Sequence, residues 1–207
     1  MVVVGLTGGM GTGKSEASRM LQELGAVLIN ADQVGHETYA PGTEAWRAVV
    51  DTFGEEVLAT GGEIDRKKLG SIVFDDPQAL ATLNAIMHPR IAQAIEKRIR
   101  ELKSQGIRVI VLEAALLVEA NWIPLTDEVW VIVAPEEAAV ERVQARSGLA
   151  EAAIRARIGS QLPQAERVRH ADAVIENAGD LDDLRSAVAN LWEKRILARQ
   201  VGNNGPE

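Results

Sequence analysis

Short runs of apolar, mostly β-branched residues recur along the chain and predict five buried strands. The runs occupy residues 2–6, 26–30, 108–112, 128–133 and 173–176. Between them, apolar residues repeat at intervals of three or four positions, a spacing that predicts amphipathic helices. Two such sets are Ile91, Ile95, Ile99 and Leu102, and Leu181, Leu184, Val188 and Leu191. Strands that alternate with helices indicate an α/β fold, in which a five-stranded parallel sheet is covered by helices on both faces.

The interval between the second and third predicted strands is too long for one crossover connection. It carries helical patterns and no clear strand, so we predict a helical insertion at residues 33–106 of a single domain. The core of that domain comprises residues 1–32, 107–145 and 170–200. The insertion is rich in aromatic and basic residues, which could bind an organic anion or could form the insertion's own small core. These residues are His36, Tyr39, Trp46, Phe53, Arg66, Lys67, Lys68, Phe74, His88 and Arg90.

A glycine-rich motif directly follows the first predicted strand. Residues 8–15 read GGMGTGKS and fit the phosphate-loop pattern G-x-x-x-x-G-K-[ST], and a helical pattern on Ala17, Met20, Leu21 and Leu24 comes next. Such a loop turns backbone N–H groups toward phosphate oxygens, its lysine reaches the β- and γ-phosphates, and its serine hydroxyl can bind Mg²⁺. The motif predicts a nucleoside triphosphate site, the alternative being a plain glycine turn. The predicted site comprises Gly8, Gly9, Met10, Gly11, Thr12, Gly13, Lys14 and Ser15, with Ser15 as the metal ligand.

A second unusual stretch, from Arg142 to Arg169, contains six arginines and no lysine. Arginine binds phosphate oxygens with paired hydrogen bonds, so a helical lid at residues 146–169 could neutralise a phosphoryl group during transfer. The alternative is that most of these arginines are exposed helix charges paired with nearby glutamates. We favour a phosphate contact for at least one of Arg142 and Arg146, because both follow closely on the fourth predicted strand.

Two acidic residues stand at the ends of predicted strands, where ligands bind in open α/β sheets. Asp32 follows the second strand and could accept a hydroxyl proton, or it could instead cap a helix beginning near Gln33. Glu113 follows the third strand, in the position of a Walker-B acid. It could bind Mg²⁺ through water or orient an acceptor, or it could be an ordinary acid at a helix start.

Composition narrows the remaining possibilities. The 207 residues, 46% hydrophobic and 25% charged, are typical of one soluble globular domain. The chain contains no apolar run of membrane-span length and no secretory start, so we expect a cytoplasmic protein with no membrane partner. The absence of cysteine excludes disulfides and thiolate metal sites. A net charge of −8 disfavours a nucleic-acid partner. We expect a monomer or weak homo-oligomer, with a disordered tail after Val201.

Five sequence blocks span nearly the whole chain and read LTGGMGTGKS, NADQVGH, MHPRI, EAALLVE and RIGSQLPQAERVRHADAVIENAG. In this order and spacing they resemble the dephospho-CoA kinase family. The resemblance implies a P-loop NTPase fold. It also implies transfer of the γ-phosphate of ATP to the ribose 3′-hydroxyl of dephospho-coenzyme A, giving coenzyme A and ADP.

The resemblance also implies roles for individual residues. It assigns ATP to the glycine-rich loop, places Asn177 near the adenine and Arg146 near the phosphates, and puts a helix break at Pro89. The implied catalytic residues are Asp32 as the base, Lys14 and Arg142. The implied acceptor-binding residues are Thr7, Asp32, His36, His88, Arg90, Glu113 and Leu116.

The chain departs from the family pattern in two places. Asn30 stands where the family has the first Asp of D-A-D, and Ala115 where it has the Pro of P-L-L. These changes bear on a second metal-binding acid and on the shape of the acceptor pocket.

Two other functions share parts of this pattern. One is a P-loop kinase for another small molecule or a nucleoside monophosphate, although such kinases usually have a shorter acceptor region than residues 33–106. The other is a nucleotide-dependent switch, but the chain lacks the N-K-x-D motif with which such GTPases recognise guanine.

Overall fold

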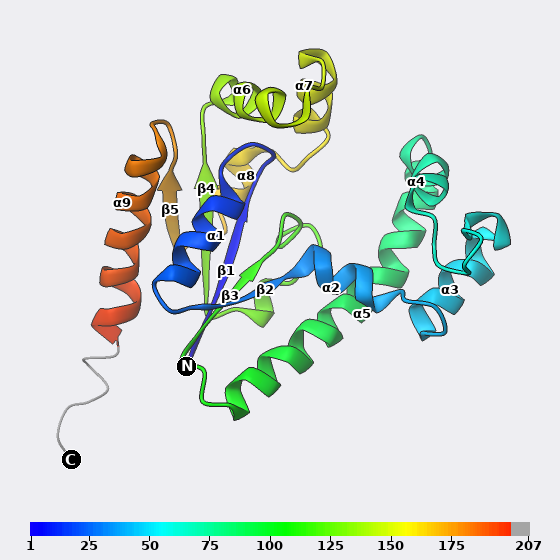
Figure 1. The fold of residues 1–207 in the computed structure, drawn as a ribbon, viewed down its shortest axis with the longest axis horizontal. Helices are drawn as coiled ribbons and strands as arrows, with labels where there is room; N and C mark the ends of the chain where they lie inside the picture. The colour runs from blue at the N-terminus through cyan, green and yellow to red at the C-terminus, as the bar shows by residue number, and fades with distance from the viewer. Residues whose placement is uncertain (200–207) are drawn as a thin grey trace. The chain divides into compact units, whose positions relative to one another are not determined.

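The computed structural model describes residues 1–199 and contains a five-stranded parallel sheet (Figure 1). Residue 200 and the tail predicted to be disordered lie outside the described residues. In the sheet, β1 pairs in parallel with β3 and β4, and β4 pairs in parallel with β5, giving the order β2-β3-β1-β4-β5. All five predicted strands are confirmed. They are β1 (Val2–Gly8), β2 (Val27–Asn30), β3 (Val109–Glu113), β4 (Glu128–Val133) and β5 (Ala173–Glu176).

Helices connect the strands, as the alternating pattern predicts. The helix bounds are α1 (Lys14–Glu23), α2 (Ala31–Thr38), α3 (Glu44–Phe53), η1 (Glu55–Val57), α4 (Arg66–Phe74), α5 (Pro77–Ser104), η2 (Ile123–Leu125), α6 (Glu136–Ser147), α7 (Glu151–Gly159), α8 (Gln164–Val168), α9 (Leu181–Trp192) and η3 (Glu193–Leu197).

One face of the sheet packs against α1 and α9, which lie side by side (Figure 1). Alternate strand residues point to this face, because successive side chains of a strand point to opposite sides. Leu6, Trp130 and Ile175 are among them, each at most 2% exposed. Each such side chain contributes about 1.5–3 kcal/mol by leaving water. The helical pattern of α1 was predicted to include Leu24, and this was wrong. Leu24 follows the end of the helix and is 40% exposed.

The opposite face of the sheet is covered by the segment that follows β3. A Cβ added to Gly5 would lie 2.8 Å from side-chain atoms of both Leu117 and Thr126, so this segment lies directly on β1. Ile110 and Val131 point to the same face of the sheet as Gly5, and both are fully buried. Both faces of the three central strands β1, β3 and β4 are therefore buried, whereas Val174 of the edge strand β5 is 42% exposed. In such a sheet, ligands bind at the carboxyl ends of the strands.

By its internal contacts, the chain divides into two compact units. The first comprises Met1–Ile29 and the chain from Leu102 onward, and the second is Asn30–Glu101. The second unit holds α2, α3, η1, α4 and most of α5. Apart from Asn30, the last residue of β2, its described residues form no strand, only an isolated bridge between Leu58 and Ile64. This agrees with the helical pattern of the insertion. The acceptor-binding role of residues 33–106 stays a prediction.

The helices after β4 have a small apolar core of their own, formed by Val140, Val143 and Ile154. Arg155 of α7 ties the surface of this region together, because it binds Glu137, Glu151 and Glu136. Hydrogen bonds to these three carboxylates, with that to Glu137 the strongest, raise the pKa of Arg155 above its ordinary value. None of the described helices is both long and apolar enough to span a membrane.

Candidate active site

The glycine-rich loop lies between the end of β1 at Gly8 and the start of α1 at Lys14. Two of its glycines adopt left-handed backbone conformations, Gly11 with φ 77° and Gly13 with φ 96°. A Cβ at Gly11 would lie 2.4 Å from the carbonyl oxygen of Ala139, and one at Gly13 would lie 2.3 Å from Nδ2 of Asn177. Glycine is therefore required at both positions by backbone conformation and by the close approach of neighbouring chain.

Hydrogen bonds from distant residues hold this loop in shape. The buried Asn177, in the turn after β5, donates from Nδ2 to the carbonyl oxygen of Thr12 at 2.8 Å. Arg142 of α6 in turn donates to Oδ1 of Asn177 at 3.3 Å, to its carbonyl oxygen at 3.1 Å and to that of Gly179 at 3.0 Å. We call Asn177 and Arg142 the loop clasp. Both residues were predicted nucleotide contacts, and the structure adds a supporting role for them.

At the helix end of the loop, the structure brings together Lys14, Ser15 and Glu113. The Ser15 hydroxyl donates to Oε1 of Glu113 at 3.3 Å, and Nζ of Lys14 lies 3.9 Å from the same oxygen. Glu113 is only 6% exposed and ends β3. No helix begins directly after it, so the alternative of a helix-start acid was wrong. The site thus joins a cation, a hydroxyl and a carboxylate where α1 directs its N–H groups outward.

Thr7 and Leu116, two predicted acceptor contacts, lie on neighbouring segments. Thr7 is fully buried in β1, and its hydroxyl donates weakly to the carbonyl oxygen of Ala115 at 3.4 Å. Leu116 is 41% exposed. The carbonyl of Ala115 thus ties the segment after β3 to β1, the side chain of Leu116 is partly exposed, and its contact with an acceptor stays a prediction.

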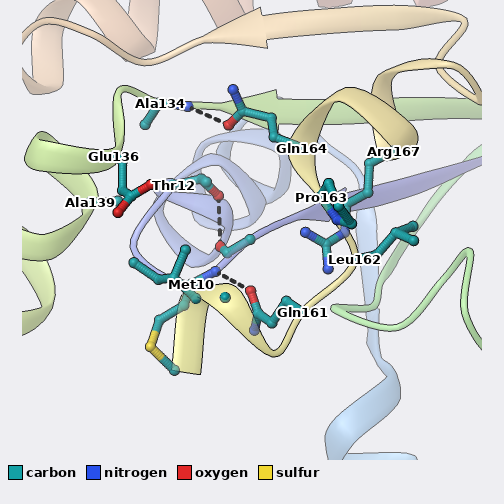
Figure 2. Close-up of a pocket in the computed structure, with 13 residues that line it drawn as sticks. Met10, Thr12, Ala134, Glu136, Ala139, Gln161, Leu162, Pro163, Gln164 and Arg167 are labelled. Carbon is teal, nitrogen blue, oxygen red and sulfur yellow. Dashed lines mark hydrogen bonds between the residues drawn. The ribbon is translucent and has the colours of Figure 1, made fainter. Parts of the chain in front are cut away.

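A cavity of about 340 Å³ opens beside the loop (Figure 2). Gln161 reaches into it from the connection between α7 and α8 and accepts a hydrogen bond from the N–H of Met10 at 2.9 Å. Gln164 accepts one from the N–H of Ala134 at 3.3 Å. The lining residues are Gly9, Met10, Thr12, Ala134, Glu136, Ala139, Ile158, Gly159, Gln161, Leu162, Pro163, Gln164 and Arg167.

Arg167 lines this cavity and is one of the six arginines of the predicted arginine-rich stretch, but sequence reasoning did not single it out. It is 3% exposed, and its Nη2 donates to Oε1 of Glu119 at 2.8 Å. The sequence does not indicate which of the six arginines in this stretch is buried. The one available signal is that Arg167 lies inside the last sequence block of the family resemblance. Two others, Arg155 and Arg169, pair with Glu151 and Glu166 on the surface, as the alternative interpretation held. Arg146 is exposed in the last turn of α6.

In the second unit, the structure decides the alternative for Asp32. The N-cap of α2 is Asn30, whose Oδ1 accepts from the N–H of Gln33 at 3.0 Å. Asp32 lies inside the first helical turn and is exposed. The capping interpretation was therefore wrong for Asp32. Asn30, which departs from the family pattern, has a capping role that either Asn or Asp can fill.

His36 lies one turn further along α2 and contacts Arg66 of α4. The Nη1 of Arg66 lies 2.6 Å from Nε2 of His36, and the ring of Tyr39 meets that of His36 edge-on at 6.2 Å between centroids. Burial raises the pKa of Tyr39, with Arg66 acting against it. Of the aromatic residues, Trp46 donates to the carbonyl oxygen of Gly62 at 2.8 Å, as a core residue would, whereas Phe74 is 84% exposed.

The predicted acceptor contacts His88 and Arg90 lie in α5, each half-buried. The helix break expected at Pro89 was wrong, since α5 runs from Pro77 to Ser104 through that residue. A proline removes one backbone donor, yet a long helix held by its packing can absorb the loss. Arg90 donates from Nη1 to the carbonyl oxygen of Ile86 at 2.8 Å, and its buried Nε has no hydrogen-bond partner among the described residues.

Comparison with known proteins identifies the family of this chain. A family profile described as dephospho-CoA kinase matches residues 2–183. The chain belongs to the dephospho-CoA kinase family. Dephospho-CoA kinase of Carboxydothermus hydrogenoformans is 44% identical over 93% of both chains, and that of Geobacter sulfurreducens is 45% identical over 95% of this chain and 100% of its own.

Solved structures agree with this assignment. Dephospho-CoA kinase from Campylobacter jejuni superposes with a TM-score of 0.71 at 27% identity, covering 95% of this chain and 98% of its own. Shikimate kinase from Acinetobacter baumannii, at 16% identity, gives a TM-score of 0.53 over 97% of this chain and 95% of its own, which shows a shared P-loop kinase fold. The matched range, residues 2–183, includes the phosphate loop, the helices of the second unit and the connection between α7 and α8 that contains Gln161.

Proposed function

We propose that this kinase transfers the γ-phosphoryl group of ATP to the ribose 3′-hydroxyl of dephospho-CoA, giving coenzyme A and ADP. The observation that carries the proposal is the pre-shaped phosphate loop, with Lys14, Ser15 and Glu113 at its helix end, in a chain that matches the family over residues 2–183. Such a loop binds the phosphates of a nucleoside triphosphate, and membership of the dephospho-CoA kinase family indicates dephospho-CoA as the acceptor.

In this proposal the loop N–H groups and Lys14 hold the phosphates of ATP, and the loop clasp lies toward the adenosine. Two hydrogen bonds from Arg142 hold Asn177, which adjoins Gly13, so the clasp would also limit where the nucleoside can lie. Arg146, exposed at the end of α6, is free to approach the phosphates when the lid region 146–169 closes.

The donor set at the helix end of the loop fits Mg²⁺. Magnesium prefers oxygen ligands and is commonly held by one hydroxyl or carboxylate together with substrate phosphates. The hydroxyl of Ser15 and the carboxylate of Glu113, 3.3 Å apart, would hold it, Glu113 through water. When bound, the ion would screen negative charge between the β- and γ-phosphates.

Asp32 is the proposed base for the acceptor hydroxyl. Its carboxylate is exposed and is not used as a helix cap, so it is available to a substrate. His36, His88, Arg90 and Leu116 are the proposed acceptor contacts. Because phosphoryl transfer has a loose transition state, alignment and charge neutralisation should supply most of the rate, and proton removal by Asp32 should come late.

An acceptor panel tests this function. ADP release from ATP should be fast with dephospho-CoA and slow with shikimate, gluconate or nucleoside monophosphates, and the product should carry one new phosphate on the 3′-oxygen of the ribose by phosphorus NMR. Equal or faster turnover with another acceptor would refute the proposal. ADP release unaffected by every acceptor would indicate an ATPase or switch.

A further inference from the structure

Arg167 is a buried cation placed against the phosphate loop. It belongs to α8, is 3% exposed, and lines the cavity of about 340 Å³ together with Gly9, Met10 and Thr12 of the loop. Its Nη1 lies 3.5 Å from the position that a Cβ on Gly9 would occupy. Figure 2 shows its guanidinium group between the lid connection and the loop. A buried arginine is costly unless its N–H groups are used.

The hydrogen bonds found for Arg167 do not use all of its donors. Arginine has five N–H groups in a planar fork. Nη2 donates to Glu119 at 2.8 Å, while Nε is buried and has no hydrogen-bond partner among the described residues. One carboxylate thus holds one edge of the fork and keeps the charged group oriented, and the Nη1 side faces the loop. An arginine held in this way is suited to receive an anion at the cavity.

The two ends of the phosphate loop have different neighbours. Asn177 adjoins Gly13, where the loop enters α1, and Arg167 adjoins Gly9, where the loop leaves β1. A bound triphosphate also has two ends, the nucleoside and the terminal phosphate. If the nucleoside lies toward Asn177 and Lys14 reaches the β- and γ-phosphates, as in the proposed function, Arg167 can approach the terminal phosphate from the Gly9 side of the loop, away from Asn177.

We propose that Arg167 contacts the terminal phosphate of bound ATP and stabilises the negative charge on that group during transfer, and that Glu119 positions it. This rests on the proposed function. In the step, the bond between the γ-phosphorus and the β–γ bridging oxygen breaks, a bond from the acceptor oxygen to phosphorus forms, and the acceptor proton passes to Asp32. Arg167 exchanges no proton in this step and acts through its positive charge and its N–H groups.

The test compares Arg167→Met and Arg167→Lys with Arg169→Met, a matched control two residues along whose side chain is 72% exposed. Arg167→Met should lower kcat roughly 10³-fold, the lower end of the effect of arginines that stabilise a transferring phosphoryl group. Arg167→Lys keeps the charge but not the fork and should fall in between. Arg169→Met should retain wild-type kcat.

Nucleotide binding separates catalysis from a merely structural role. ADP lacks the terminal phosphate, so its affinity for Arg167→Met should stay within about threefold of wild type, while affinity for ADP with aluminium fluoride and dephospho-CoA falls with kcat. Unchanged kcat in both Arg167 variants would overturn the proposal. Equal losses of ADP affinity and kcat would also overturn it, because they would indicate that Arg167 only supports the loop.

A measurement on the wild-type protein decides the matter if the variants do not fold. A crystal with ADP, aluminium fluoride and dephospho-CoA should show Nη1 or Nε of Arg167 within hydrogen-bond distance of a fluoride. A guanidinium bonded to Glu119 alone would refute the proposal. Failure of the proposed function looks different: the wild-type protein would then form no coenzyme A from dephospho-CoA, whatever the state of Arg167.

Discussion

Replacing Asn177 of the loop clasp by aspartate exchanges one NH₂ group for a carboxylate oxygen. The amide Nδ2, which donates to the carbonyl oxygen of Thr12 at 2.8 Å, becomes an oxygen that faces that carbonyl. The Oδ1 atom that accepts from Arg142 is kept. Asn177 is 5% exposed, so water cannot replace the lost donor. The substitution therefore tests how much one hydrogen bond contributes to the shape of the phosphate loop.

The expected magnitude follows from the two partners of Asn177. Loss of the hydrogen bond costs about 1 kcal/mol, and leaving the buried Thr12 carbonyl opposite an oxygen adds about 1–3 kcal/mol. A stronger, charge-assisted bond to Arg142 offsets roughly 1 kcal/mol of this. We expect a net loss of about 1–3 kcal/mol in the free energy of unfolding, which lowers Tm by roughly 2–12 °C for a chain of this size.

Urea unfolding and calorimetric titration with ATP measure both consequences. Asn177→Asp should lower stability by the amount above and should raise the Kd for ATP roughly tenfold, equivalent to about 1.4 kcal/mol. The control is Asn190→Asp, which makes the same chemical change at an exposed position of α9. If the two variants unfold at the same urea concentration and bind ATP equally well, the clasp does not hold the loop and the reasoning is refuted.

Three further substitutions test the site. Lys14→Ala should lower kcat/KM for ATP by roughly 10²–10³-fold or more in steady-state assays, since it removes a cation at the phosphates; a smaller loss would argue against that contact. Asp32→Asn should lower kcat roughly 10²–10⁴-fold without changing the Kd for ATP, and full activity would disprove the base assignment. Gly11→Ala should reduce thermal stability more than Gly148→Ala. Both glycines have left-handed backbones, φ 77° and 67°, but only at Gly11 does a Cβ meet a neighbour, the Ala139 carbonyl 2.4 Å away. Equal shifts in Tm would contradict the clash.

The parts of the fold that could be predicted are those set by local pattern. Each strand is a short apolar run, and the central strands β1, β3 and β4 are buried on both faces, so the residues of a strand identify it without knowledge of its neighbours. The glycine-rich loop is equally local, because backbone conformation at Gly11 and Gly13 admits few other residues. The identity of the acceptor and the catalytic roles of single residues were predicted from the family resemblance, not from these local patterns.

The details that failed depend on contacts between distant residues or on near-equal local choices. Asn30 and Asp32 are both good N-caps two positions apart, and only the observed helix start distinguishes them. The bond from Asn177 to Thr12 joins residues 165 positions apart, which no local pattern encodes. Likewise, the burial of Arg167 depends on Glu119, 48 positions away, so sequence spacing could not separate it from the surface arginines around it.

These distant contacts give the phosphate loop its shape from within the protein. The N–H of Met10 donates to Gln161, the carbonyl of Thr12 accepts from Asn177, and the hydroxyl of Ser15 donates to Glu113. The three partners come from the lid connection, the end of β5 and the end of β3, so the loop is held from three sides at the carboxyl edge of the sheet. The N–H dipoles of the loop are thus aligned before any phosphate binds, so binding would carry no free-energy cost of ordering them. Dipoles fixed in advance are also what allows a site to stabilise the charge of a transition state. Residues outside the loop therefore set its conformation.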